Sequence, residues 1–496
     1  MSSHVKTITM KSSTMFFGKI FDSLLMFVFN IFAARLLGAK DYGTYVYLST
    51  IIMFGSIGLK MGLDQGIAAI VPKYDDDKIK KSIISFSLAF IVVMSLSLTL
   101  LSIVFSDFIS VFILNNGSLS TYYVQMIPLL LFYALLQLSE GIFRTYGNIR
   151  DYVIAKNIIM PISILLVFLV GAFGFDIRTV QMLIISNYFG WILATLYILY
   201  TLIREQVIVL PSLKYVSIYK YLFALSIPLI FVGLLDYLVG RTDTFVVGYL
   251  IDEKSVGIYN VIDKVAYLSG YFFIAFSSIL APYITKLYHD KEIEKLEVLY
   301  KTITRLIVFI NVGVMYLIIL NANEILMIFG QEYTVGYTIL IITVIAYTVN
   351  ALGGPVVYMN TMTGAGRTEL WIGSIMLILN VVLDWILVKR VGLIGVAITT
   401  LLVFFGGMVF RLYIMKKRLS ILPFDRQYVF ILLIASGLFV VVNWMPVHDY
   451  VDNDLVVIIV SSFIYTLLYC GAVFGIVLDD MGRKNMMKTI MQIFNR

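Results

Sequence analysis

The chain has 496 residues, of which 60% are hydrophobic and only 14% are charged. An ordinary soluble domain carries about 25% charged residues, so this composition excludes a soluble globular protein. The formal net charge of +7 does not call for nucleic acid as a partner, because basic cytoplasmic loops of a membrane protein account for it. Apolar runs of about 18 residues or more recur along the chain, each long enough to cross a bilayer. The sequence therefore predicts an all-α polytopic membrane protein.

About fourteen apolar runs are candidate transmembrane helices. We expect the first to be a retained helix, because it continues without the small-residue cleavage site of a signal peptide. The loops between the runs are short, and none is long enough to hold a soluble domain. In chain order the predicted spans cover residues 13–36, 43–71, 82–106, 121–143, 152–174, 179–202, 218–250, 255–285, 303–322, 334–360, 368–388, 393–415, 428–446 and 455–478.

The distribution of lysine and arginine predicts the orientation. If the N-terminus is inside, the inner loops and both tails hold 27 of the 37 basic residues, whereas the outer loops hold six. Lysine and arginine are enriched in cytoplasmic loops, so we expect a multi-pass protein of the cell membrane with both termini in the cytoplasm. The pair Lys389-Arg390 is a mild exception, because it falls in an outer loop.

Little in the sequence suggests covalent chemistry. Cys470 is the single cysteine and excludes a disulfide within the chain, and the three histidines are scattered, so neither a metal site nor a cofactor is expected. The acidic run Asp75-Asp76-Asp77 offers the one feature of a membrane glycosyltransferase or ligase. It is flanked by four lysines in a short inner loop, which favours a solvated loop over a catalytic motif.

Two parts of the chain are similar to one another, which indicates an internal duplication. Gly43 and Tyr45 match Gly257 and Tyr259 at a shift of 214 residues, and at the same shift Asp22 falls on Asp236. Gly147 and Arg150 likewise match Gly364 and Arg367 at a shift of 217. We therefore predict two six-helix lobes related by an axis along the membrane normal, followed by two extra helices. The predicted divisions are residues 1–203, 204–416, and 417–496 with a basic cytoplasmic tail.

Charged residues within the spans are candidates for function, because a charge at the bilayer centre costs about 2.5–3.5 kcal/mol on insertion scales. When residues near the end of a span are counted with the nearer loop, four cations remain inside the spans, and all four lie on the first two helices of a repeat. The candidate substrate-binding residues are Lys19, Asn30, Lys60, Arg241 and Lys264. Five nearby acids are candidates for coupling-ion binding or charge pairing: Asp22, Asp64, Asp236, Asp243 and Asp263.

Two interpretations of these charges remain open. Lys19, Asp22 and Asn30 fall on one narrow face of the first helix, and Asp236 and Asp243 share a face of the seventh. Such polar faces are expected to turn toward a bundle interior or a water-filled cavity, where cations from both repeats would bind an anionic head group. The alternative is local neutralisation, because Lys19 with Asp22, and Lys60 with Asp64, have helical pair spacing. Glu140 and Arg144 are expected to form a structural pair of this kind.

Three segments resemble the polysaccharide transporter family of lipid-linked oligosaccharide flippases. They are RLLGAKDYGTYVYL from Arg35, DTFVVGYLIDEKSVGIYNVIDKV from Asp243, and NVVLDWILVKRVGLIGVAITTLL from Asn380. This family belongs to the group that includes multidrug and toxin extruders (MATE) and the lipid II flippase. The resemblance implies a MATE-like fold of two lobes, alternating access, and a substrate whose sugar head is carried on a polyprenyl phosphate or diphosphate.

We therefore expect a flippase, not an enzyme, that moves a polyprenyl-linked oligosaccharide from the cytoplasmic to the outer leaflet for polysaccharide or glycan assembly. The expected partners are this lipid-linked oligosaccharide, membrane lipids, and H⁺ or Na⁺ as a coupling ion, and the protein is expected to be a monomer. A cation-coupled multidrug extruder of the same fold is the main alternative, and a membrane glycosyltransferase or ligase is the alternative from another class.

Overall fold

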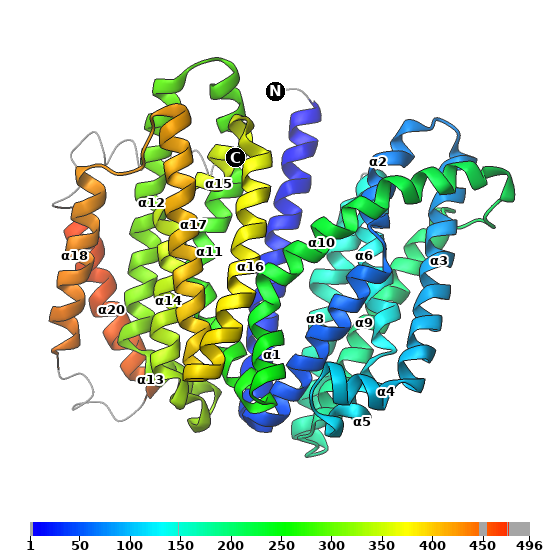
Figure 1. Ribbon diagram of the computed structural model, residues 1–496, viewed down its shortest axis with the longest axis horizontal. Helices are drawn as coiled ribbons and strands as arrows, with labels where there is room; N and C mark the ends of the chain where they lie inside the picture. The colour runs from blue at the N-terminus through cyan, green and yellow to red at the C-terminus, as the bar shows by residue number, and fades with distance from the viewer. Residues whose placement is uncertain (1–2, 147, 446–453, 474, 476–496) are drawn as a thin grey trace. The chain divides into compact units, whose positions relative to one another are not determined.

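The computed structural model describes residues 3–146, 148–445, 454–473 and 475 (Figure 1). Helices joined by short turns make up this part of the chain, and no strand is found in it. Clustering of backbone contacts divides the chain into two compact units between Gly257 and Ile258, which we call unit 1 and unit 2. The helix α11, Glu253–His289, runs across this division.

Unit 1 contains the N-terminal helices and also α10. Its α-helices are α1 Ser3–Leu59, α2 Leu63–Ile70, α3 Asp77–Val104, α4 Ser106–Phe108, α5 Ser120–Met126, α6 Leu129–Tyr146, α7 Ile149–Val153, α8 Met160–Leu169, α9 Val180–Arg204 and α10 Val216–Leu250. Short π-helical segments are η2 Ile109–Ile113, η4 Ile154–Ile159 and η5 Val170–Gly174, and 3-10 turns are η1 Val71–Lys73, η3 Gly117–Leu119 and η6 Leu213–Tyr215.

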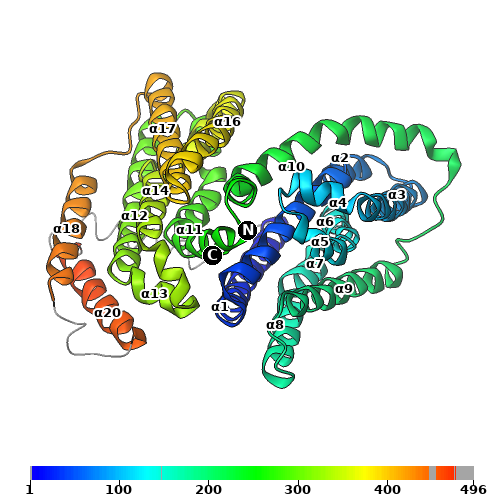
Figure 2. The same ribbon diagram turned by 60° about the horizontal axis from the view of Figure 1, so that its bottom comes forward.

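Unit 2 contains the remaining helices. They are α12 Ile293–Leu320, α13 Ala322–Phe329, α14 Tyr337–Leu352, α15 Val356–Asn360, α16 Gly366–Val391, α17 Ile394–Leu419, α18 Arg426–Asn443 and α20 Asp454–Ala472, with η7 Gln331–Gly336 and η8 Thr361–Ala365 between them. In both views α18 and α20 lie together beside α12 (Figures 1 and 2). The Tyr469 ring of α20 stacks on Phe309 of α12 at 5.0 Å, and the Ser436 hydroxyl of α18 shares a hydrogen bond of 2.8 Å with Tyr316 of α12, so both helices are fastened to α12.

The all-helical, membrane-spanning architecture is confirmed, whereas the count of fourteen spans stays a prediction. A helix overlaps each predicted range. By length and apolarity, nine helices of the described residues are able to cross a membrane, or ten if the pair 117–126 and 129–146, bent by 51°, is one span. The predicted divisions at 203 and 416 also remain predictions, and the predicted tail at 481–496 lies outside the described residues.

Glycines in the left-handed region separate the first helices. Gly38 has φ 82° and interrupts α1 between the first two predicted spans. The expected continuous helix over 43–71 is wrong, because α1 ends at Leu59 and α2 begins at Leu63. Met61 at φ 49° and Gly62 at φ 68° make the intervening turn. Glycine adopts this backbone conformation at no steric cost, so Gly62 allows a break within an apolar run.

The repeat-related glycines Gly43 and Gly257 lie against each other's helices, both within unit 1. A methyl group on Gly43 would overlap the carbonyl oxygen of Glu253, and one on Gly257 would overlap that of Ala39. Ala39 and Glu253 are themselves related by the shift of 214 residues. The contact is therefore reciprocal, as expected where duplicated helices pack about a local two-fold axis, and it requires both positions to lack a side chain.

Candidate functional site

The polar face of α1 contains one exposed side chain, Lys19, and one buried side chain, Asn30. Lys19 is exposed, and the preceding Gly18 packs directly against Val153 and Asn157, which places Lys19 at the level of η4. Asn30 is only 5% exposed. Its amide oxygen accepts a hydrogen bond of 2.6 Å from the Tyr42 hydroxyl, and its amide nitrogen donates to the Met26 carbonyl. The amide of Asn30 therefore ties α1 together across its kink at Gly38.

Lys60 forms the local pair that the structural alternative predicts. Its Nζ lies 2.9 Å from Asp64 Oδ2, and the two side chains are only 13% and 16% exposed. The pair bridges the turn between α1 and α2 and is not a helical neighbour pair within one helix, because the helix is broken there. Removing one partner from a pair of this kind leaves an uncompensated charge in an apolar setting, so we assign the pair a structural role.

Lys156 was not identified by the sequence analysis. It lies on the π-helical segment η4, seven residues after the start of α7, which is about 10 Å along the helix axis. Its Nζ lies 4.8 Å from the centre of the Trp191 ring and 3.5 Å from Met160 Sδ. No carboxylate of the described residues lies within ion-pairing distance of this ammonium group. A cation held in this way keeps its hydrogen-bonding capacity for another anion.

Asp22 on α1 and Glu140 on α6 are the two acids close enough to act electrostatically on Lys156. Glu140 is engaged elsewhere: it accepts from Arg144, confirming the predicted pair, and from the Tyr152 hydroxyl at 3.1 Å. Four helical segments of unit 1 thus converge on one polar cluster, which comprises Lys19, Asp22, Glu140, Arg144, Tyr152 and Lys156 and which we call the unit 1 cluster. It contains three cations and two acids, and Lys19 is exposed on the surface.

The remaining predicted residues lie on α10 and α11. Arg241 and Asp243 are partly buried on α10, and Asp263 and Lys264 are partly buried on α11. Asp263 accepts a hydrogen bond of 2.7 Å from the Tyr347 hydroxyl, which joins α11 to α14 within unit 2. The side chain of Asp236 lies outside the part of the chain that the structure describes. The vestibule shared by cations of both repeats stays a prediction.

Unit 2 holds a second buried network that the sequence analysis missed. Arg411 Nε donates to Glu369 Oε2 at 2.9 Å, and the side chains are 11% and 8% exposed. Asn360 donates to the other oxygen of Glu369 at 2.8 Å. The network joins α15, α16 and α17, and the charges of Arg411 and Glu369 neutralise each other. In the described residues no group of three or more His, Cys, Asp or Glu lies together as metal ligands.

The sequence is similar to a known protein family and to two individual proteins. A family model described as polysaccharide biosynthesis protein matches residues 32–337. The chain is 25% identical over 415 residues to the capsular polysaccharide biosynthesis protein CapF of Staphylococcus aureus, covering 81% of this chain and 98% of CapF. It is 21% identical over 471 residues to the uncharacterized membrane protein MJ1068 of Methanocaldococcus jannaschii, covering 88% of each.

Solved structures with the same fold include two kinds of transporter. The lipid II flippase MurJ in an inward closed conformation matches with a TM-score of 0.71 at 16% identity, over 93% of this chain and 98% of that chain. An inward-facing multidrug resistance transporter of the MATE family matches with a TM-score of 0.65 at 15% identity, over 80% and 94%. The MATE-like fold implied by the sequence is thereby confirmed.

Proposed function

The chain belongs to the family of polysaccharide biosynthesis proteins, and on this basis we propose that it is a flippase for a lipid-linked oligosaccharide. The family match over residues 32–337, on a chain with a transporter fold, is the observation that carries the proposal. Transport of this kind breaks no bond. The polar head crosses the membrane through the protein while the polyprenyl chain stays in hydrocarbon, so the protein replaces the water that the head group loses.

The unit 1 cluster supplies the chemistry that an anionic head group needs. Phosphate oxygens accept strong charge-assisted hydrogen bonds from lysine and arginine. Lys156 offers an ammonium group that has no ion-pair partner among the described residues, and Lys19 offers an exposed one on the adjoining helix. We assign both to binding of the polyprenyl phosphate or diphosphate. Arg241 and Lys264 are proposed to receive the head group later in the cycle, whereas Lys60 is already neutralised by Asp64.

The proposal also covers the direction of transport and the ion that drives it. We propose that the head group moves from the cytoplasmic to the outer leaflet of the cell membrane by alternating access, with both termini in the cytoplasm and the protein acting as a monomer. H⁺ or Na⁺ is proposed as the coupling ion. The candidate acids are Asp22, Asp236, Asp243 and Asp263, with Asp64 set apart by its ion pair.

The proposal is tested in vesicles that contain the purified protein. A fluorescent oligosaccharide linked to polyprenyl diphosphate is placed in one leaflet, and its appearance in the other is followed by a quencher that does not cross the bilayer. We expect translocation above that of protein-free vesicles. Efflux of cationic dyes without translocation of the glycolipid would overturn the proposal.

A multidrug extruder remains the second candidate, because the MATE transporters share the fold. The charges of the unit 1 cluster disfavour a multidrug extruder. Cationic drugs need acidic groups that are free to bind them. Glu140 already accepts hydrogen bonds from Arg144 and Tyr152, and the charge of Lys156 acts on both Glu140 and Asp22. Direct dye binding to the purified protein, competed by the lipid-linked oligosaccharide or not, separates the two candidates.

A further inference from the structure

The segment that connects α9 with α10, residues 207–215, is fastened to α3 by hydroxyl groups. The backbone amide of Val209 donates to the Ser85 hydroxyl at 2.9 Å, and that of Ser212 donates to the Ser82 hydroxyl at 3.1 Å. Ser82 also shares a hydrogen bond of 2.6 Å with the Tyr219 hydroxyl of α10. Backbone amides that lack helical partners are therefore satisfied by α3, and the segment keeps a defined path along that helix.

This segment presents large apolar side chains outward. Leu210 is 93% exposed and Leu213 is 87% exposed. Two leucines displayed on a fixed loop are unfavourable in water and favourable in the boundary between head groups and acyl chains. Lysines accompany them, since Lys214 and Lys220 are exposed and Lys73 lies 5.9 Å from the centre of the Tyr221 ring. Apolar and basic groups together indicate contact with the membrane interface on the side that the lysine tally predicts to be cytoplasmic.

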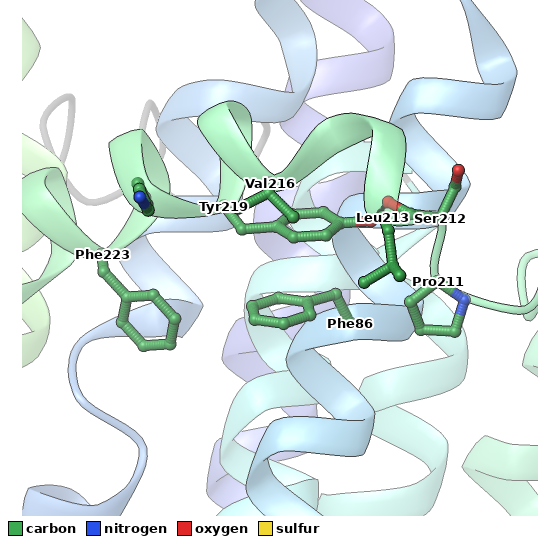
Figure 3. Close-up of a pocket in the computed structure, with 8 residues that line it drawn as sticks. Phe86, Pro211, Ser212, Leu213, Val216, Tyr219 and Phe223 are labelled. Atoms are coloured by element: carbon green, nitrogen blue, oxygen red, sulfur yellow. Dashed lines mark hydrogen bonds between the residues drawn. The ribbon is translucent and has the colours of Figure 1, made fainter.

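An apolar pocket of about 220 Å³ opens beneath this segment (Figure 3). One wall is a stack of the Phe86 and Tyr219 rings, whose centres are 4.0 Å apart and whose planes differ by 1°. Phe223 closes one side, and Pro211 and Leu213 close the other. Lys220 is the one charged residue of the lining. Its ammonium group has no ion-pair partner among the residues that the structure describes.

We propose that this pocket binds one acyl chain of an anionic bilayer phospholipid, with the lipid phosphate held by Lys220. The apolar lining matches hydrocarbon, and the lysine at the pocket matches the negative charge of the head group. A pocket of this size holds a short stretch of a single unbranched chain, which favours an acyl chain over a branched polyprenyl chain. Bound lipid would fill the space between α3 and α10 and hold the start of α10 in place. The inference requires only that the protein lie in a membrane and is independent of the transported substrate.

The test is native mass spectrometry of the detergent-purified full chain, titrated with phosphatidylglycerol or phosphatidylcholine of matched acyl chains. One lysine near a lipid surface contributes about 1 kcal/mol toward anionic lipid, which corresponds to about five-fold in affinity. We expect the wild-type protein to bind one phosphatidylglycerol about five-fold more tightly than phosphatidylcholine. Lys220→Gln should bring the two affinities close together. Lys214→Gln is the matched control and should keep the preference, because Lys214 does not line the pocket.

A second variant tests the hydrocarbon part of the site. Val216→Trp places a large ring in the pocket, so we expect it to lose both lipids while its melting temperature without added lipid stays close to that of the wild type. If Val216→Trp fails to fold, the Lys220 and Lys214 variants decide the question alone. The proposal would be overturned if the wild type bound the two lipids equally. It would also be overturned if a folded Val216→Trp variant bound lipid as tightly as the wild type. Displacement of phosphatidylglycerol by polyprenyl phosphate at equal concentration would also overturn it, by assigning the pocket to the carrier. Translocation of the oligosaccharide is measured separately, so neither result depends on the other.

Discussion

Lys156 is a cation of the unit 1 cluster that forms no ion pair among the described residues. Its ammonium group rests on the Trp191 ring and Met160, while the nearby Glu140 is held by Arg144 and Tyr152. The Trp191 ring is in turn fixed by Tyr133, whose ring centre is 4.0 Å away. A cation over an aromatic face gains about 0.5–2 kcal/mol, less than a buried ion pair would give. A phosphate group is therefore able to compete for this lysine.

Replacing Lys156 tests its role in head-group binding. A hydrogen bond to a charged group contributes about 1.5–3 kcal/mol, so Lys156→Met should weaken binding of a polyprenyl diphosphate by about ten-fold or more. Lys156→Arg keeps the charge and should recover part of the affinity. Binding is measured by intrinsic tryptophan fluorescence or native mass spectrometry. Lys40→Met, an exposed lysine in a predicted outer loop, is the matched control. Unchanged binding by Lys156→Met would remove this residue from the site.

The Lys60–Asp64 pair gives a prediction of stability. Breaking a buried pair costs about 3–5 kcal/mol, and this pair should give somewhat less because both side chains retain some exposure. We expect Lys60→Met and Asp64→Asn each to lower the melting temperature of the purified protein. The double variant should be more stable than the sum of the two effects predicts, because it leaves no isolated charge. Strict additivity of the two changes would show that the residues act independently.

The sequence identified the helices that carry charged residues, but it did not show which of these charges are paired and which are not. Spacing alone left Lys60 open to either interpretation, because the positive φ at Met61 and Gly62 that breaks the helix is a backbone property. Lys156 lies four residues inside the predicted span 152–174, close enough to its end to count with the neighbouring inner loop. Its position is apparent only when α1, α6 and η4 are packed together. The pairing of Glu140 with Arg144 depends on helical spacing and was correctly predicted.

At the scale of helices, the reciprocal contact of Gly43 and Gly257 joins α1 to the start of α11. The matching residues were recognised in the sequence as a sign of duplication, but their contact was not predicted. Residues 214 positions apart carry no local signal of proximity. Nevertheless, similarity between repeats is informative about packing, because a two-fold arrangement brings equivalent positions near the axis into contact.

Alanine substitutions test this contact, with control glycines on α1 and α10. Gly43→Ala and Gly257→Ala should each destabilise the protein strongly, because the added methyl group overlaps a backbone carbonyl that has no freedom to rotate away. Gly58→Ala on α1 and Gly240→Ala on α10 meet no atom within 4 Å. Alanine is favoured over glycine in a helix by up to about 1 kcal/mol, so these controls should be neutral or stabilising. Thermal melting in detergent measures all four. Equal melting temperatures for the two pairs would contradict the close packing.

At the scale of the whole molecule, the apolar runs predicted an all-helical membrane protein, and the resemblance to known transporters predicted its fold. Both are confirmed, because the requirement for satisfied backbone groups in a bilayer leaves few alternatives to helices. The ends of the spans were less predictable. The π-helical segments η4 and η5 lie within the predicted span 152–174, and the pattern of apolar residues does not distinguish a π-helix from an α-helix.

The central claim is that the protein moves an oligosaccharide by recognising the phosphate of its lipid carrier. It is tested most directly in vesicles with two fluorescent glycolipids that share one glycan and one polyprenyl chain and differ only in the diphosphate between them. We predict that the wild-type protein translocates the diphosphate-linked glycan and leaves the neutral analogue in its leaflet, and that Lys156→Met slows the first without accelerating the second. Equal translocation of both glycolipids by the wild-type protein would contradict the claim.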